Sequence, residues 1–149
     1  MRIEKFTLSY YEELVEMYRL FITEIYPSRK IGTNYFFHKV VMEWIKNNRD
    51  INIALDDKGK ALGFTMCYED NNGGTTSSVY NGEIIYVNKQ SRKSKVAYKL
   101  FKITEKHAHS LGMQVVGSAL IQGGMAEMMS KHFSIVPKFV IMEGTQDGI

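Results

Sequence analysis

A short basic segment holds the residues whose types and spacing are best suited to chemistry. Arg92, Lys93 and Lys95 stand between an apolar stretch that ends at Val87 and a stretch with helical spacing that begins at Ser94. The first backbone N–H groups of a helix have no partner within the helix and lie at the positive end of its dipole, so they can bind a phosphate or a pyrophosphate. The segment therefore predicts an anion site. The alternative is an ordinary connection between a strand and a helix, with solvated lysines.

Two regular elements must position this segment. Residues 79–87 are rich in β-branched and aromatic side chains and are too few for a typical helix, which predicts a buried strand. From Ser94 to Leu111 the apolar residues recur on one helical stripe and lysines occupy the opposite face, and Gly112 is placed to end the helix. The sequence thus predicts a strand, a tight basic turn and a helix in direct succession.

The rest of the chain supplies further strands and helices around this unit. Residues 9–12 form a capping box that would start the first helix. The expected elements are a strand at 2–7, helices at 9–26 and 33–47, a hairpin of strands at 51–55 and 61–68, the strand and helix described above, a strand at 113–120, a short helix at 125–132 and a final strand or strand pair at 133–142. The order is β-α-α-β-β-β-α-β-α-β. A parallel crossover at 79–87 with helices on both faces predicts an α/β fold with a mixed sheet.

Length and composition bound the class of protein. With 149 residues, the chain is long enough for one domain, residues 1–149, with a single core. Hydrophobic residues make up 44% and charged residues 23%, which is ordinary for a globular protein. No apolar run approaches the length that crosses a bilayer, and the charged start lacks the apolar segment of a signal peptide. We therefore expect a cytoplasmic protein with no membrane partner.

The charged and metal-binding residue types limit the partners. The net charge of +3 suits a polyanionic cofactor but is too small to require a nucleic acid, which only a row of lysines after Ser94 favours. Cys67 is the only cysteine, which excludes an intrachain disulfide and argues against a thiolate metal cluster. The four histidines lie on separate predicted elements or faces, so we assign them to the surface or to packing and expect no metal site.

Residues 87–100 resemble motif A of the GNAT superfamily of acyl-CoA N-acyltransferases. In that motif a strand ends in a valine and leads through Arg/Gln-x-x-Gly-x-Gly/Ala into a helix, and here the run is Arg92-Lys93-Ser94-Lys95-Val96-Ala97. Arg92 and Ala97 match, whereas Lys95 stands where the family prefers glycine, the residue used where backbone approaches a ligand closely. The predicted element order is similar to the GNAT fold over nearly the whole chain. This resemblance implies a mostly antiparallel sheet of six or seven strands.

The resemblance also implies a cofactor and its contacts. It implies that acetyl-CoA is the co-substrate and that the backbone of residues 92–97 holds its pyrophosphate. Backbone groups of residues 85–87 would align the pantetheine arm, and one N–H group there would polarise the thioester. The implied cofactor contacts are Ile85, Tyr86, Val87, Arg92, Lys93, Ser94, Lys95, Val96 and Ala97.

The implied reaction is N-acetyltransferase chemistry, in which an amine attacks the acetyl thioester directly. It needs a base for the amine proton and benefits from an acid for the leaving thiolate. Glu83 is the candidate base, because a carboxylate in an otherwise apolar strand can take up a proton directly or through water. The alternative is that Glu83 points to a solvated or salt-bridged face of the strand. Tyr86 is a second catalytic candidate and Tyr80 an alternative, unless these phenols only pack. The acceptor would be an amine of a small molecule, or a lysine or N-terminus of a protein.

The C-terminal part departs from the family pattern. Met129 stands where motif B of the family has a tyrosine acid, and a thioether cannot donate a proton. Ser118, Ser130 or His132 could replace it, or the thiolate leaves unaided. Residues 133–143 are short for the hairpin that closes the acceptor side, which implies an open groove or one completed by a second subunit of a homo-oligomer. The alternative function is a catalytically silent GNAT-fold subunit that binds within, or supports, a larger assembly.

Overall fold

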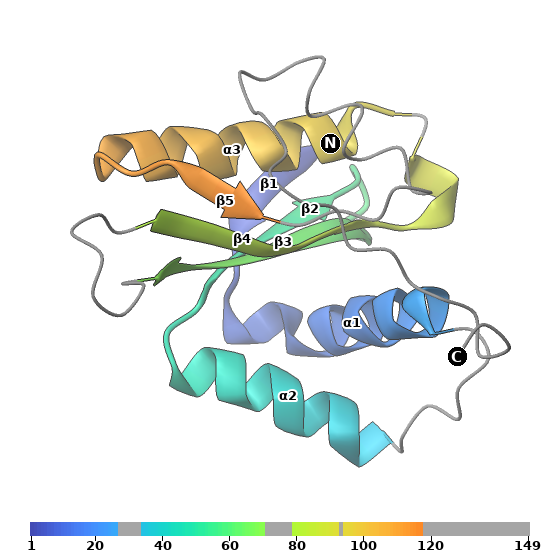
Figure 1. Ribbon diagram of the computed structural model, residues 1–149. Coiled ribbons are helices and arrows are strands. Elements are labelled where there is room, and N and C mark those ends of the chain that lie inside the picture. Colours follow the sequence, from blue (N-terminus) through green and yellow to red (C-terminus); the bar gives the residue numbers. More distant parts are fainter. Residues whose placement is uncertain (27–33, 71–78, 93, 118–149) are drawn as a thin grey trace, which may run out of the picture.

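The computed structural model describes residues 1–26, 34–70, 79–92 and 94–117, which form a five-stranded sheet with helices on both faces (Figure 1). The elements, in chain order, are β1 (Arg2–Lys5), the 3-10 turn η1 (Leu8–Tyr10), α1 (Tyr11–Ile25), α2 (Asn34–Lys46), β2 (Asp50–Leu55), β3 (Ala61–Asp70), β4 (Val79–Val87), the 3-10 turn η2 (Lys89–Ser91), α3 (Val96–Ser110) and β5 (Val115–Gly117). None of the helices in these ranges is long and apolar enough to cross a membrane.

The sheet is mixed and mostly antiparallel, which confirms this part of the predicted α/β fold class. Its strands lie in the order β1-β2-β3-β4-β5; the first three neighbouring pairs are antiparallel, and β5 runs parallel to β4 after the crossover through α3. Five of the expected six or seven strands are described. The last expected helix and strand, and with them Met129, Ser118, Ser130 and His132, lie outside the described residues.

An aromatic core joins α1 and α2 to one face of the sheet. The ring of Tyr18 in α1 meets the rings of Trp44 and Phe37 in α2 edge to face, with centroids 4.8 Å and 5.9 Å apart. Trp44 in turn packs against Phe64 of β3, with centroids 6.1 Å apart. Pairs of this kind add about 0.5–1.5 kcal/mol each beyond the area they bury. The core therefore fixes α1 over β3 and β4.

The opposite face is covered by α3 (Figure 1). Val96 and Leu100 are buried against Ala54 and Val87 of the sheet, which gives the first half of the helix its apolar contact. The helix is followed by Gly112 at a φ of +71°, a left-handed conformation that favours glycine, as the sequence predicts.

Cys67 is fully buried beneath α3. Its sulfur lies 3.9 Å from the hydroxyl of Thr104, and burial raises the pKa of its thiol to about 12. A thiol with so high a pKa is not a nucleophile at neutral pH. Cys67 is therefore a packing residue.

A polar cluster anchors the C-terminal half of α3 to the starts of β2 and β4. The Asp50 carboxylate accepts hydrogen bonds from the side chains of Lys5 and Tyr80 and lies 3.8 Å from Nε2 of His107. Burial alone would raise the pKa of Asp50, but these two hydrogen bonds and the charge of Lys5 hold it below its ordinary value. His107 also packs edge-on against the Tyr80 ring, with centroids 5.4 Å apart. The cluster thus holds the first part of β4 in place.

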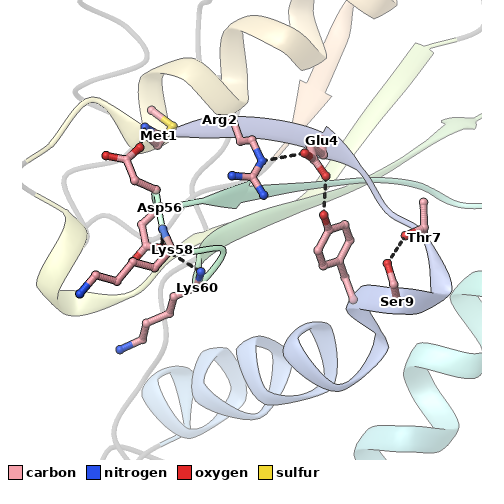
Figure 2. A network of polar contacts seen from close by, with 10 residues as sticks. Met1, Arg2, Glu4, Thr7, Ser9, Asp56, Lys58 and Lys60 are labelled. Atoms are coloured by element: carbon pink, nitrogen blue, oxygen red, sulfur yellow. Dashed lines mark hydrogen bonds and ion pairs between the residues drawn. The ribbon is translucent and has the colours of Figure 1, made fainter.

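The hairpin between β2 and β3 is confirmed. The carboxylate of Asp56 accepts hydrogen bonds from the N–H groups of Lys58 and Lys60, both at 2.8 Å (Figure 2). Gly59 in the same turn has a φ of +82°. The Asp-rich, glycine-containing sequence therefore forms the tight turn that its residue types favour.

The start of α1 differs from the prediction. Ser9 lies in the turn η1, where its hydroxyl meets the hydroxyl of Thr7 at 2.7 Å instead of capping the helix (Figure 2). Tyr10 is the N-cap residue, without a side-chain cap, and its phenol donates a hydrogen bond to Glu4 of β1. The predicted capping box is wrong because the chain makes one tight turn before the helix, which moves the helix start past Ser9.

Candidate functional site

A β-bulge at Glu83 divides β4 into two parts. Gly82 pairs with Cys67 of β3 and Ile84 pairs with Met66. Glu83 is therefore an extra residue that has no pairing partner on β3. One extra residue in a strand reverses the alternation of side chains between the two faces of the sheet. The two parts of β4 therefore direct their side chains differently.

The bulge decides where the candidate base lies. Before it, Tyr80 packs on the α3 side; after it, Ile84 and Tyr86 belong to the core under α1 and α2. Glu83 sits at the point of change and its side chain is exposed. This position agrees with the solvated alternative for Glu83, since a bulged residue is displaced from the regular pleat.

Beyond the bulge, the edge of β4 on the side away from β3 pairs with no strand that the structure describes. The N–H of Asn88 donates to the carbonyl of Leu62 in β3 at 2.9 Å, and backbone groups alternate along an antiparallel strand. The backbone groups of Tyr86 therefore point toward β3, whereas those of Ile85 and Val87 point away from it. Among the described residues, β5 pairs only with the part of β4 before the bulge. An extended ligand with amide groups could pair with such an edge as an added strand does.

The start of α3 follows directly on this edge through a short turn. The side-chain and backbone carbonyl oxygens of Asn88 both accept from the N–H of Ser91, at 3.1 Å and 3.0 Å, which sets the direction of the turn. Lys95 is the N-cap residue of α3 and makes no side-chain cap, and the first turn of the helix has no acidic residue. In the part of the chain that the structure describes, no side chain caps the N–H groups of Val96 and Ala97. These donors can therefore bind an anion.

The remaining basic-turn residues have different surroundings. The hydroxyl of Ser94 donates to the carbonyl of Ser91 and so belongs to the turn itself. Lys95 is exposed at the start of the helix, and Lys93 lies outside the described residues. The φ of Lys95 is −82°, outside the left-handed region, so the backbone at this motif position does not require the glycine that the family prefers.

The Arg92 side chain is engaged in contacts within the protein, with Val87 and Glu24. Its Nε donates to the carbonyl of Val87 at 3.0 Å, and its terminal nitrogens contact both carboxylate oxygens of Glu24 at the end of α1, one of them at 2.6 Å. Its guanidinium also lies 5.7 Å from the centre of the Tyr86 ring. Burial alone would raise the pKa of Glu24, but the Arg92 hydrogen bond and charge lower it. Arg92 thus ties α1 to the end of β4.

Glu24 is a site residue that sequence reasoning missed. It lies 68 positions from Arg92 in the sequence, and no motif marks it. Only the packing of α1 across β4 brings the two together.

Tyr86 is buried behind the free edge. Its ring packs edge to face on Phe21 of α1, with centroids 5.8 Å apart, and against Phe64 at 6.3 Å. Burial raises the pKa of its phenol, and the nearby charge of Glu24 adds to this. A phenol that holds its proton so firmly is a poor base, and its side chain packs α1 against β4.

The structure offers no cluster of metal ligands within the described ranges. No group of three or more histidine, cysteine, aspartate and glutamate side chains is gathered there as a metal site would need.

The fold is similar to that of known acetyltransferases, although the sequence matches no protein-family model and no curated protein. A crystal structure of a probable acetyltransferase is 21% identical, with a TM-score of 0.75 and 97% of each chain covered. A ribosomal-protein-alanine N-acetyltransferase from Brucella melitensis biovar Abortus 2308 is 15% identical, with a TM-score of 0.70, 95% of this chain and 99% of that chain covered.

A third neighbour was solved with its ligand bound. It is an aminoglycoside N-acetyltransferase in complex with CoA, 17% identical, with a TM-score of 0.70, 97% of this chain and 94% of that chain covered. Together with the bulged β4, the parallel crossover and the uncapped start of α3, these likenesses show that the chain has the GNAT acetyltransferase fold, of which it is a divergent example.

Proposed function

We propose that the protein is an N-acyltransferase that transfers the acetyl group of acetyl-CoA to an amine by direct attack. The observation that carries the proposal is the adjacency of two sets of backbone groups that have no partner among the described residues: the edge of β4 after Glu83 and the uncapped N–H groups that open α3. The first suits the two amides of a pantetheine arm, and the second suits a pyrophosphate. Both belong to one continuous stretch of chain.

Each group has a stated part in this proposal. The N–H groups of Val96 and Ala97, with the charge of Lys95, would bind the pyrophosphate. Ile85 would pair with the pantetheine amides, and an N–H group near the bulge would polarise the thioester carbonyl. Val87 would contribute its N–H only, because Arg92 already occupies its carbonyl. Glu83 would take the proton of the attacking amine.

The acceptor is proposed as a class and not as a compound. One structural neighbour is an aminoglycoside N-acetyltransferase and another is a ribosomal-protein-alanine N-acetyltransferase, so both small molecules and proteins serve as acceptors for enzymes of this fold. An exposed carboxylate at the bulge suits either, because both acceptors carry a protonated amine at neutral pH.

Thermal unfolding with acetyl-CoA tests the cofactor half of the proposal. A ligand at about 100 times its Kd adds about 2.7 kcal/mol, which is a rise in Tm of roughly 5–10 °C for a chain of this size. Lys95→Glu should remove most of that rise, since it places a negative charge at the phosphate position. Lys106→Glu is the matched control: it makes the same charge change on an exposed position of the same helix, almost three turns farther on. An equal loss in both variants would contradict the assigned site.

Turnover separates the proposed enzyme from the alternative. Release of free CoA is followed with kanamycin A, a peptide with an N-terminal alanine, and polylysine as acceptors. The alternative, a silent GNAT-fold binding subunit, is favoured by the engagement of Arg92 with Glu24, which removes one motif charge from the ligand. Binding of acetyl-CoA without release of CoA above the rate without protein would support that alternative.

A further inference from the structure

The strand β1 forms one edge of the sheet, and its outer side pairs with no strand that the structure describes. In the strand order β1-β2-β3-β4-β5, only β2 lies beside β1. The N–H of Phe6, just after β1, donates to a carbonyl of β2 at 2.9 Å. Because backbone groups alternate along an antiparallel pair, those of Arg2 and Glu4 also point toward β2. The N–H and carbonyl groups of Ile3 and Lys5 therefore point outward, away from the sheet.

An open, largely apolar groove lies beside this edge, on the face of the sheet that α3 covers. Ile3 points to that face, where it packs against Ala54, Val96 and Leu100. Met1 remains 40% exposed and Ile103 remains 36% exposed, although both are large apolar residues. Exposed apolar side chains that gather in one place, with charges around them, are typical of a protein contact surface. The groove is lined by Met1, Ile3, Tyr98, Lys99, Lys102 and Ile103.

The opposite face of β1 carries one positive and one negative charge. The Nε of Arg2 donates to the carboxylate of Glu4 at 2.7 Å, and the phenol of Tyr10 donates to the same carboxylate (Figure 2). Charged residues ordinarily protect an edge strand from pairing with another chain. Here the two charges have opposite signs and lie two positions apart on one face. They can therefore complement themselves when a second copy of β1 runs antiparallel to the first.

Only one two-fold register of two β1 strands makes use of this complementarity. With the axis at Ile3, Arg2 of each copy lies opposite Glu4 of the other, at a non-hydrogen-bonded pair where opposite side chains are closest. With the axis at Glu4, the two Glu4 carboxylates would lie opposite each other, and with the axis at Lys5 the two ammonium groups would. Like charges placed directly opposite are destabilising. The outward direction of the Ile3 backbone groups fits the same register, because each Ile3 can then donate to and accept from the other.

We propose that β1 is a dimer interface, in which β1 pairs antiparallel with β1 of a second copy of this chain around a two-fold axis at Ile3. The pairing joins the two sheets into one and covers Met1 and Ile3 on the side of α3. The charged ends of Lys99 and Lys102 stay in solvent at the rim of the groove. One short strand is a small contact, so the dimer is weak, with a Kd of roughly 10–500 µM. The inference does not depend on the proposed acetyltransferase activity.

Sedimentation equilibrium between about 10 µM and 1 mM protein tests the interface. The weight-average mass of the wild type should rise from the monomer value of 17.1 kDa toward twice that value. Arg2→Glu and Glu4→Arg each convert two attractive cross-strand pairs into repulsive ones, so each should raise the Kd at least about tenfold. Arg19→Glu is the matched control, because Arg19 is also an exposed arginine paired with a glutamate of its own element, on α1. It should leave the Kd within about twofold of the wild type.

A mixture of the two charge variants gives the sharper result. The Arg2→Glu chain carries two acidic side chains on this face of β1, and the Glu4→Arg chain carries two basic ones. Neither should pair with itself, whereas the equimolar mixture should dimerise again, because positions 2 and 4 then meet as opposite charges at both pairs. Both side chains are at least 38% exposed, so the variants should remain folded, which their urea midpoints would show.

Three outcomes would overturn the inference. A wild type that stays monomeric at about 1 mM would do so, whether the edge stays in solvent or is covered by another part of the chain or by another protein. A dimer that Arg2→Glu and Glu4→Arg leave intact would place the contact elsewhere on the molecule. Folded variants that fail to associate when mixed would exclude the antiparallel register at Ile3.

Discussion

Replacing Gly63 by alanine should destabilise the protein and weaken acetyl-CoA binding at the same time. A Cβ at position 63 of β3 would lie 2.3 Å from the carbonyl oxygen of Tyr86 and 3.1 Å from the Cα of Val87. Both are backbone atoms of β4, so they cannot rotate away as the end of a flexible side chain would. The only relief is a movement of β4 relative to β3, in the part of the strand that carries the free edge.

The size of both effects follows from the geometry. Ordinary contacts begin at 3.4 Å, so the strands must separate by roughly 1 Å near Tyr86. Overpacking of a buried position typically costs about 1–3 kcal/mol. If the shift removes two backbone hydrogen bonds to the pantetheine arm, at about 0.5–1.5 kcal/mol each, the Kd for acetyl-CoA should rise by about 5- to 150-fold.

Gly59→Ala is the control that separates the two effects. Gly59 has a φ of +82°, and a Cβ added there would meet no atom within 4 Å, so alanine is strained by about 1–2 kcal/mol without touching β4. Urea unfolding measures stability and calorimetric titration measures affinity. Both variants should lose stability, and only Gly63→Ala should lose affinity. Equal Kd values in the two variants, or a Gly63→Ala protein as stable as the wild type, would refute the reasoning.

Two further changes test the surroundings of the site. Arg92→Lys keeps the charge but not the fork that contacts Val87 and Glu24 together, so it should lower stability by about 1 kcal/mol and weaken acetyl-CoA binding; a simple phosphate cation would tolerate the change. Because the folded-state pKa of Asp50 is lowered, its carboxylate stabilises the fold above the ordinary value of 3.8, and this contribution is lost as the pH falls through the lower folded pKa. Asp50→Asn should therefore be less stable at neutral pH and lose less stability on acidification, which urea midpoints across that range would show.

The strand, turn and helix around the basic segment could be predicted from the sequence because their signals are local. The change from a short β-branched run to helical spacing at Ser94, and the glycine after Leu111, each depend on neighbouring residues only. The same holds for the turn at Asp56, whose side chain bonds to N–H groups two and four residues farther on. Such features need no knowledge of the tertiary structure.

The arrangement of the site could not be predicted in the same way. At Glu83 the register between β3 and β4 shifts by one residue, between the Cys67–Gly82 pair and the Met66–Ile84 pair. No residue type in β4 predicts this shift. Glu24 lies on a helix whose sequence is that of an ordinary amphipathic helix, and it reaches the site only because the packing of α1 on the sheet brings it to Arg92. The prediction of Ser9 as a helix cap was wrong for a related reason. The neighbouring Tyr10 makes a hydrogen bond from its phenol to Glu4 of β1, which is a contact between elements far from any local signal.

The bulge explains how one strand can serve two sites. Without the extra residue, Tyr80, Gly82, Ile84 and Tyr86 would share a face, and the strand would have one regular edge along its whole length. With it, the first part of β4 is held by the polar cluster of Asp50 and pairs with β5. The second part turns its side chains toward the core under α1, and its outer edge pairs with no described strand. The candidate base therefore stands where the proposed cofactor edge begins. The position of this single inserted residue links cofactor binding to proton transfer in the proposed reaction.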